Sequence, residues 1–288
     1  MISLVLAMAV MAQTDPAAPV EPTPPAVAPA TSVPHPLHLR WDWHVDVPVA
    51  SALTVAWVLS EFVIKKPLAP TACRWCATNS FDTSIRAVFN PTRTPSAFGL
   101  AGPDTASYMT GMVALPIVML GLDALWAWKG GGTEMDWLAD TLIMIESTFS
   151  ALAVSQTTKY IAGRARPYTV DAPAELLATA RDPTDHYVSF FSGHTTFAFS
   201  LAVSAGLTAS LRKYKYAWVT WVAGLSLATA TMVLRIAADK HWTTDVLVAM
   251  AVGTAGGIAI PLLFHPQEGA PSVNLAVMPN GLAVSGRF

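Results

Sequence analysis

Apolar runs of membrane-spanning length recur along this chain, and they constrain its fold more than any other feature. A helix needs about 20 apolar residues to cross the hydrocarbon core of a bilayer. Of the 288 residues, 53% are hydrophobic and only 12% are charged, whereas a soluble domain carries about 25% charged residues. Most of the protein surface therefore cannot face water. The sequence predicts an all-α, polytopic membrane helical bundle.

The clear spans are expected over residues 106–128, 135–163, 193–211, 216–235 and 243–264. A shorter apolar segment, residues 48–64, contains Glu61 and is either a first span or a helix in the membrane interface. We therefore expect five or six spans. The protein is therefore expected to be embedded in the bilayer. Its net charge of −2 gives no sign of a nucleic-acid partner.

The ends of the chain differ from the apolar middle. Residues 1–12 resemble a secretory signal peptide, although no Lys or Arg precedes the apolar run, so an N-terminus that is never cleaved remains an alternative. Residues 13–36 are Pro/Ala-rich and predict a disordered linker. The helical bundle is expected over 37–265. The tail, 266–288, alternates around a Pro-Asn-Gly turn, which is typical of a β-hairpin.

Several residues outside the main motifs have two interpretations. Cys73 and Cys76 form a C-x-x-C pair, which predicts a local disulfide if its loop faces an oxidising compartment. Asp123, Asp140 and Glu146 lie within apolar runs, where a carboxylate either has a function or pairs with polar neighbours inside the bundle.

One polar stretch interrupts the apolar pattern near the C-terminal end. It contains Arg235, His241 and Asp245. Residues four apart share a face of a helix, so Asp245 is expected to hold one imidazole nitrogen of His241 and leave the other free. A histidine backed by aspartate and faced by arginine suits attack on a phosphoryl group. The alternative is a polar helix end at the membrane surface.

A second cluster places two cations at the end of another span. Lys159 and Arg166 are seven residues apart, about two helical turns, so both can point the same way. Pro167 disfavours helix at the preceding residue and ends the element there. Two cations with no acidic partner between them need an anion, unless they are a basic helix end that snorkels to the interface.

A third cluster, Ser192-Gly193-His194, directly precedes an apolar run. Ser192 is a good N-cap, and Gly193 lets a ligand approach the backbone closely. The free N–H groups of a helix start bind phosphate readily, and His194 beside them can donate a proton to a leaving oxygen. No set of clustered carboxylates is evident to hold Mg²⁺. The three clusters together therefore indicate metal-independent phosphoryl transfer without a cofactor.

The order K-x6-R-P, S-G-H and R-x5-H-x3-D resembles the type-2 phosphatidic acid phosphatase superfamily, which also includes the vanadium haloperoxidases. Two positions depart from its usual pattern. Phe191 stands where the family usually has Pro, and Leu234 stands where it often has Ser. The resemblance implies a bundle of about six helices. It also implies that His241 attacks phosphorus to form a phosphohistidine, that Asp245 orients it, and that His194 protonates the leaving alcohol and later activates water.

The resemblance further implies a phosphate site and a substrate class. The groups expected to hold the phosphate oxygens are Lys159, Arg166, Arg235 and the backbone of Ser192 and Gly193. Arg164, between the motif positions, is left out of this expected site. The implied substrate is a lipid phosphate or diphosphate, and phosphatidate, phosphatidylglycerol phosphate, undecaprenyl diphosphate and lipid A phosphate are all compatible. A non-catalytic phospholipid-binding protein and a vanadate-dependent haloperoxidase are the alternatives. No oligomeric state is indicated.

The side of the membrane depends on how many segments cross. With a cleaved signal and six later spans, the motif residues face the cytoplasm; with five spans, or six and an uncleaved N-terminus, they face outward. The outward arrangement places Arg212, Lys213 and Lys215 inside, as the positive-inside rule prefers. We therefore expect an integral protein of the bacterial inner membrane with a periplasm-facing active site.

Overall fold

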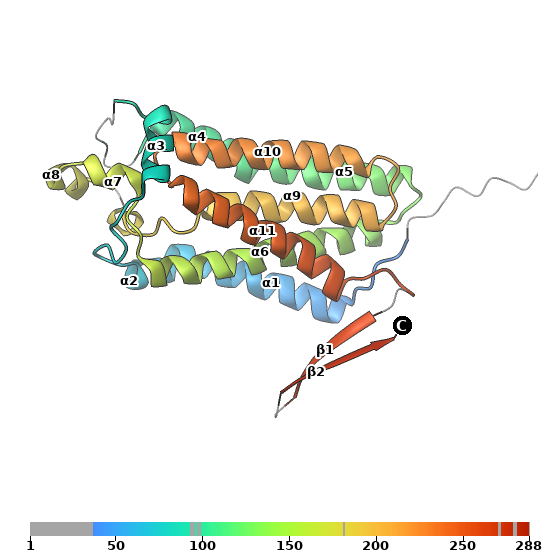
Figure 1. Cartoon of the computed structure of the whole chain (residues 1–288). Helices are drawn as coiled ribbons and strands as arrows, with labels where there is room; N and C mark the ends of the chain where they lie inside the picture. The colour runs from blue at the N-terminus through green and yellow to red at the C-terminus, as the bar shows by residue number, and fades with distance from the viewer. Residues whose placement is uncertain are drawn as a thin grey trace, which may run out of the picture. The chain divides into compact units, whose positions relative to one another are not determined.

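The described residues of this computed structural model are 37–92, 96, 99–180, 182–269, 272–278 and 281–287. The expected signal peptide and linker lie outside them. Within these residues, six long helical segments run alongside one another (Figure 1). They are α1 (Trp43–Leu59) continued by η1 (Ser60–Ile64) and α2 (Lys65–Leu68); α4 (Ala101–Tyr108) continued by η2 (Met109–Ala114) and α5 (Leu115–Lys129); α6 (Glu134–Ala162); α9 (Gly193–Leu211); α10 (Ala217–Ala237); and α11 (Thr243–Phe264). The predicted all-α bundle is confirmed.

Shorter elements connect the long ones and complete the chain. They are α3 (Ser80–Phe89), α7 (Pro167–Asp171), α8 (Ala174–Ala178), the 3-10 turn η3 (Pro183–Asp185), β1 (Ser272–Met278) and β2 (Gly281–Arg287). The two strands pair antiparallel, from Ser272 opposite Arg287 to Met278 opposite Gly281. The predicted C-terminal hairpin is therefore confirmed.

Five of the long segments are apolar enough to cross a membrane: Trp43–Leu68, Ala101–Lys129, Glu134–Ala162, Ala217–Ala237 and Thr243–Phe264. The first is 26 residues long, with a mean hydropathy of 1.8. It contains residues 48–64, which the sequence analysis interpreted as either a span or an interfacial helix, and it has the length of a span. It is longer than the apolar core of 48–64 because Asp42 caps the helix at its start by accepting a hydrogen bond from the His44 amide.

The sixth long segment, α9, is the central helix of the bundle. It contacts α5, α6, α10 and α11, and most of its side chains are buried. Because its neighbours enclose it, α9 can carry polar side chains that a lipid-facing helix could not. Ser200 donates to the Ser147 carbonyl on α6, and Ser204 lies 3.0 Å from the Ser147 hydroxyl.

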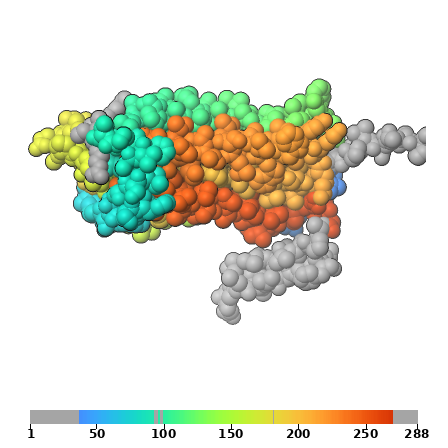
Figure 2. Space-filling model, turned by 45° about the horizontal axis from the view of Figure 1, so that its top comes forward, coloured from blue at the N-terminus to red at the C-terminus, as the bar shows by residue number. Residues whose placement is uncertain are grey.

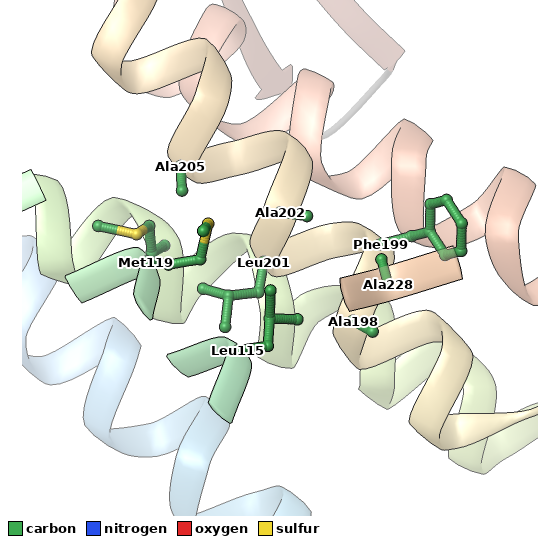
Figure 3. Close-up of a cluster of buried hydrophobic side chains, with 9 residues drawn as sticks. Leu115, Met119, Ala198, Phe199, Leu201, Ala202, Ala205 and Ala228 are labelled. Atoms are coloured by element: carbon green, nitrogen blue, oxygen red, sulfur yellow. The ribbon is translucent and has the colours of Figure 1, made fainter. Parts of the chain in front are cut away.

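Small residues set the packing around α9. Figure 3 shows the main buried cluster, in which Leu115 and Met119 of α5 meet the alanine-rich surface of α9. On α11, a Cβ added at Gly253 would lie 2.6 Å from the Thr196 carbonyl oxygen. Glycine at this position therefore lets α11 approach α9 backbone to backbone.

Apolar side chains cover the outside of the long helices. On the face shown in Figure 2, α10 lies between α5 and α11. Large exposed apolar residues on α10 and α11 include Trp218, Val222, Leu247 and Leu262. Exposed apolar side chains on spanning helices are what contact with lipid tails requires.

Buried charge pairs stabilise the bundle end at which α6 begins and α9 finishes. The Arg212 guanidinium is 1% exposed and donates to Asp136 at 2.7 Å and to Asp140 at 2.7 Å. The sequence analysis counted Arg212 among three basic residues on the inner side of the membrane, and the structure shows that its guanidinium is buried in these ion pairs. Of its two interpretations, Asp140 therefore follows the one in which an intramembrane carboxylate pairs with a polar neighbour inside the bundle.

Candidate active site

A cavity of about 530 Å³ opens at the bundle end where α6 and α10 finish and α9 and α11 begin. Six of the eight candidate residues line it: Lys159, Arg166, Gly193, His194, Arg235 and His241. Ser192 and Asp245 do not line it, and both are fully buried. The three sequence clusters, separated by many residues along the chain, therefore meet at one site.

Arg166 reaches this cavity by a different route from the one its spacing suggested. The helix α6 ends at Ala162, and Gly163 follows in the left-handed conformation with φ of 56°, so Lys159 and Arg166 are not on one helix. The Arg166 guanidinium instead donates to the backbone carbonyl oxygens of Asp185 at 2.6 Å and Lys240 at 3.0 Å. These bonds fix its position 3.2 Å from the Nε2 atom of His241.

His241 lies in the turn between α10 and α11, before the helix begins, so the expected shared helical face with Asp245 is wrong. Its Nδ1 atom lies 2.8 Å from the Ser189 carbonyl oxygen and 3.7 Å from the Asp245 carboxylate. A carbonyl oxygen only accepts, so Nδ1 carries the proton and Nε2 keeps its lone pair. This tautomer aims the nucleophilic nitrogen at Arg166 and the cavity.

Asp245 acts on His241 through its neighbours. Its Oδ2 atom accepts from the Ser189 hydroxyl at 2.6 Å and from the Trp242 amide at 2.9 Å. The carboxylate therefore holds in place the residue whose carbonyl binds Nδ1, and it also fixes the turn that carries His241.

The electrostatics of the cavity keep His241 neutral. Burial disfavours the imidazolium, and the nearby cations Arg166, Arg235 and Lys159 repel it further, so the pKa of His241 lies well below its usual value of 6.5. A neutral imidazole whose Nε2 atom carries a lone pair and no proton is the form that can act as a nucleophile.

The Ser192-Gly193-His194 cluster begins α9 as the sequence predicted. The Ser192 hydroxyl accepts from the Thr195 amide at 3.4 Å, which makes it the N-cap. A Cβ added at Gly193 would lie 3.0 Å from the Lys159 ammonium nitrogen, so glycine leaves room for that cation beside the helix start. The centres of the His194 and Tyr108 rings lie 6.3 Å apart. Among the described residues, His194 has no hydrogen-bond partner for its side chain. It is therefore free to bond a ligand in the cavity.

The cations of the cavity have acidic partners that the sequence analysis missed. Arg235 donates to Asp104 at the start of α4, and Asp185 lies 2.5 Å from Lys65 and 3.6 Å from Arg166. Burial alone would raise the pKa of Asp185, but these two cations outweigh burial and hold it well below its usual range. Of the two cations expected to lack an acidic partner, Arg166 pairs with Asp185 from a distant segment, so for Arg166 the expectation is wrong. Among the described residues, Lys159 forms no ion pair and donates to the side chain of Gln156.

A profile of the PAP2 superfamily matches residues 140–268, a segment that contains all eight candidate residues. Residues 140–268 form a PAP2-superfamily region. Among solved structures, the chain is similar to "the first transmembrane PAP2 type phosphatidylglycerolphosphate phosphatase from Bacillus subtilis", with 17% identity, a TM-score of 0.46, and coverage of 73% of this chain and 93% of that one. No curated protein matches the chain.

Arg164 is the functional neighbour that the PAP2 motif pattern did not indicate. Its guanidinium donates to Asp245 at 2.5 Å, to Asp82 at 2.7 Å and to Thr244 at 2.7 Å. It therefore fixes the carboxylate behind His241. The position of Arg164 between two motif residues was a weak sign of a role at the site. Its partner Asp82 lies in a distant part of the chain, and no sequence pattern connects Arg164 with Asp82.

Lys240, the residue that precedes His241 in the sequence, is a further cation that lines the cavity. Its ammonium nitrogen lies 3.7 Å from the Asp104 carboxylate. Burial and the neighbouring Arg166 lower the pKa of Lys240 to about 8. This cation is therefore present at neutral pH and is lost in mildly alkaline solution.

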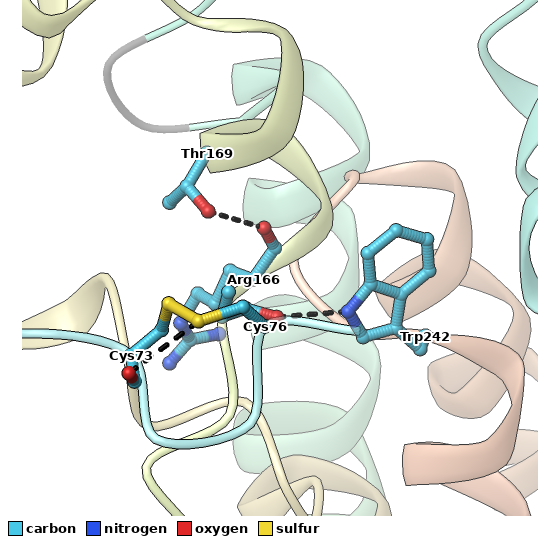
Figure 4. The surroundings of a disulfide bond; sticks show 6 residues. Cys73, Cys76, Arg166, Thr169 and Trp242 are labelled. Atoms are coloured by element: carbon cyan, nitrogen blue, oxygen red, sulfur yellow. Dashed lines mark hydrogen bonds between the residues drawn. A yellow bond between two sulfur atoms is a disulfide. The ribbon is translucent and has the colours of Figure 1, made fainter. Parts of the chain in front are cut away.

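A disulfide braces the segment that carries Arg164 and Arg166. Cys73 and Cys76 are bonded to each other, and Figure 4 shows them beside Arg166 and Trp242. Within this turn, the Trp75 carbonyl accepts from the Ala165 amide at 3.2 Å. The sequence-based prediction of a local disulfide is confirmed, and the disulfide lies at the same bundle end as the PAP2 cavity.

Proposed function

We propose that this protein is a membrane phosphatase that hydrolyses a lipid phosphate or diphosphate through a phosphohistidine on His241, without a metal ion. The observation that carries the proposal is the position of His241, whose Nδ1 atom lies against the Ser189 carbonyl oxygen and whose Nε2 atom lies 3.2 Å from Arg166, in a cavity that Lys159 and Arg235 also line. Phosphate oxygens would replace Asp104 as the partner of Arg235. The cations then offset the charge that develops on the phosphoryl group in the transition state.

In the first step, the Nε2 lone pair of His241 forms a bond to phosphorus as the bond from phosphorus to the lipid oxygen breaks. Burial and the neighbouring cations lower the pKa of His194, so the negative charge of the bound phosphate is needed to hold this imidazole in its protonated form. His194 then gives its proton to that departing oxygen, so that a neutral alcohol leaves. The Nδ1–H of His241 keeps its hydrogen bond to Ser189, which stabilises the positive charge that forms on the imidazole ring.

In the second step, His194 takes a proton from water as the water oxygen bonds to phosphorus. The bond between phosphorus and Nε2 breaks, and its electron pair returns to His241. Inorganic phosphate leaves, His194 is again protonated, and the site returns to its starting state.

The lining of the cavity supports a lipid substrate. On the sides formed by α1 with η1, α4 with η2, and α6, apolar and aromatic residues adjoin the cations: Trp57, Phe62, Tyr108, Met112 and Leu152. These residues belong to the spanning segments and their neighbours, so a head group can bind the cations while its acyl or prenyl chains remain in the bilayer.

An outward, periplasmic orientation is proposed for the cavity. A disulfide is stable in an oxidising compartment, and Cys73–Cys76 lies at the bundle end of the cavity. Because the first segment is long enough to span, this orientation corresponds to six crossings and the uncleaved N-terminus. After mild reduction, a membrane-impermeant thiol reagent should label Cys73 and Cys76 in intact spheroplasts. Labelling only after lysis would place the cavity in the cytoplasm.

The test of function is phosphate release by the detergent-purified protein, with EDTA present, from the four candidate lipids and a soluble aryl phosphate. The wild-type protein should turn over at least one lipid, and His241→Ala should release no phosphate. His44→Ala serves as the matched control, because His44 is exposed at the other end of α1.

A trapping experiment separates the two histidines. With a ³²P-labelled aryl phosphate, whose leaving group needs no proton, His194→Ala should accumulate label on the protein and His241→Ala should not. Label on His241→Ala would refute the phosphohistidine. Binding of phospholipid without release of phosphate from any substrate would favour the non-catalytic alternative, and halide oxidation dependent on added vanadate would favour the haloperoxidase.

A further inference from the structure

Three metal-ligating side chains meet at the bundle end opposite the cavity. Asp46 lies in the first turn of α1, Glu146 lies on α6, and His265 follows the last residue of α11. One ligand atom of each lies within 4.8 Å of the other two. All three are buried, with 8%, 6% and 2% of their surfaces exposed, respectively.

The charges of this cluster do not balance. Two carboxylates carry a charge of −2, and a protonated imidazole would supply only +1. Among the described residues, neither Asp46 nor Glu146 forms an ion pair with a lysine or an arginine, and the Oε1 atom of Glu146 is buried without a hydrogen-bond partner. An uncompensated buried charge is strongly unfavourable.

The orientation of His265 adds a second, independent observation. Its Nδ1 atom lies 3.0 Å from the Arg40 carbonyl oxygen, which can only accept, so Nδ1 carries a proton. In the neutral ring, Nε2 then directs its lone pair at the Oε2 atom of Glu146, 3.1 Å away. Two electron-rich atoms at this distance need a positive charge between them, either a proton or a metal ion.

We propose that Asp46, Glu146 and His265 bind a divalent transition-metal ion, with zinc as the best fit. Two carboxylates, a neutral imidazole and a 2+ ion sum to zero charge. Neighbouring ligands on a tetrahedral zinc with bonds of about 2.0–2.1 Å lie about 3.3 Å apart, close to the 3.1 Å between Nε2 and Oε2. A backbone carbonyl that accepts the other imidazole N–H, as Arg40 does here, is the usual support of a metal-bound histidine.

The function of such a site is structural, because it joins α1, α6 and α11 at the end where no catalytic group lies. The ion connects the start of the first span to the end of the last one, which are more than 200 residues apart in the sequence. It also supplies the partner that the Oε1 atom of Glu146 lacks. The cluster takes no part in the phosphatase reaction, so metal binding and turnover can be tested separately.

The first test measures metal content of the full chain. The detergent-purified protein is stripped with a chelator, dialysed against micromolar Zn²⁺ and analysed by mass spectrometry for zinc. The wild-type protein and His241→Ala should each retain about one zinc per chain, because His241 lies in the other site. Glu146→Gln and His265→Ala should retain less than a tenth of that amount.

The second test reads the geometry and guards against variants that fail to fold. Co²⁺ bound to the stripped wild-type protein should give the visible absorption bands of a tetrahedral site, and added Zn²⁺ should abolish them. Zn²⁺ should also raise the melting temperature of the wild-type protein but not that of Glu146→Gln, which keeps the shape of the side chain. Zinc-free wild-type protein after dialysis, or equal zinc in Glu146→Gln, would overturn the proposal and leave a shared proton as the explanation of the cluster.

Discussion

Replacing Arg164 with alanine tests the packing behind the proposed nucleophile. The Arg164 side chain is 1% exposed, and its guanidinium is the only cation that donates to both Asp82 and Asp245 among the described residues. Both carboxylates are fully buried. The guanidinium also packs 4.2 Å from the centre of the Trp75 ring.

The expected cost follows from the charges left behind. Removal of one partner of a buried ion pair destabilises a protein by about 3–5 kcal/mol, because the remaining charge loses its compensation. Arg164→Ala leaves two such carboxylates, so we expect a loss at the upper end of that range. Arg164→Lys keeps the charge but cannot donate to both carboxylates in the same fixed geometry, and its loss should be intermediate.

The assay is unfolding by SDS in detergent micelles, followed by circular dichroism, with Arg74→Ala as the matched control. Among the described residues, the exposed Arg74 guanidinium donates only to the backbone carbonyls of Tyr160 and Ile161, so its removal should cost about 1 kcal/mol. If Arg164→Ala is no less stable than Arg74→Ala, the two carboxylates are compensated in some other way and the reasoning is wrong.

Two further predictions concern helix packing and pH. Gly253→Ala should destabilise the bundle by about 1–3 kcal/mol, because the added methyl group would meet the Thr196 carbonyl at 2.6 Å. The control in the same unfolding assay is Gly121→Ala, which should cost no stability, because no atom lies within 4 Å of its added Cβ. Since the pKa of Lys240 is about 8, its ammonium is charged below that pH and lost above it, so kcat/KM for phosphate release should fall as the pH rises through 8. Lys240→Met should have a lower kcat/KM at pH 7 and a shallower alkaline decline than the wild-type protein, and an unchanged decline in that variant would assign it to another group.

Local patterns predicted the parts of the fold that depend on neighbours in the sequence. The apolar runs defined the long helices, because lipid contact selects residue by residue for apolar side chains. The N-cap at Ser192 and the hairpin at the C-terminal end were predictable for the same reason, since a cap or a tight turn involves only a few consecutive residues. The disulfide Cys73–Cys76 is equally local.

Helical spacing failed where a helix ends. The four-residue interval between His241 and Asp245 indicated a shared face, but α11 begins only at Thr243. The seven-residue interval between Lys159 and Arg166 is interrupted by Gly163. In both pairs the residues still meet at one site, because the turns between helices bring them there.

The sequence by itself therefore determined that this chain is a membrane helical bundle with a PAP2 motif, and it supplied three cations, two histidines and one carboxylate of the candidate site. Only the tertiary structure decided which of those charges face one another. Arg164 with Asp82, Arg235 with Asp104 and His265 with Glu146 each join segments at least 82 residues apart. Such pairs leave no periodic pattern, because their partners are selected by contact between folded helices and not by distance along the chain.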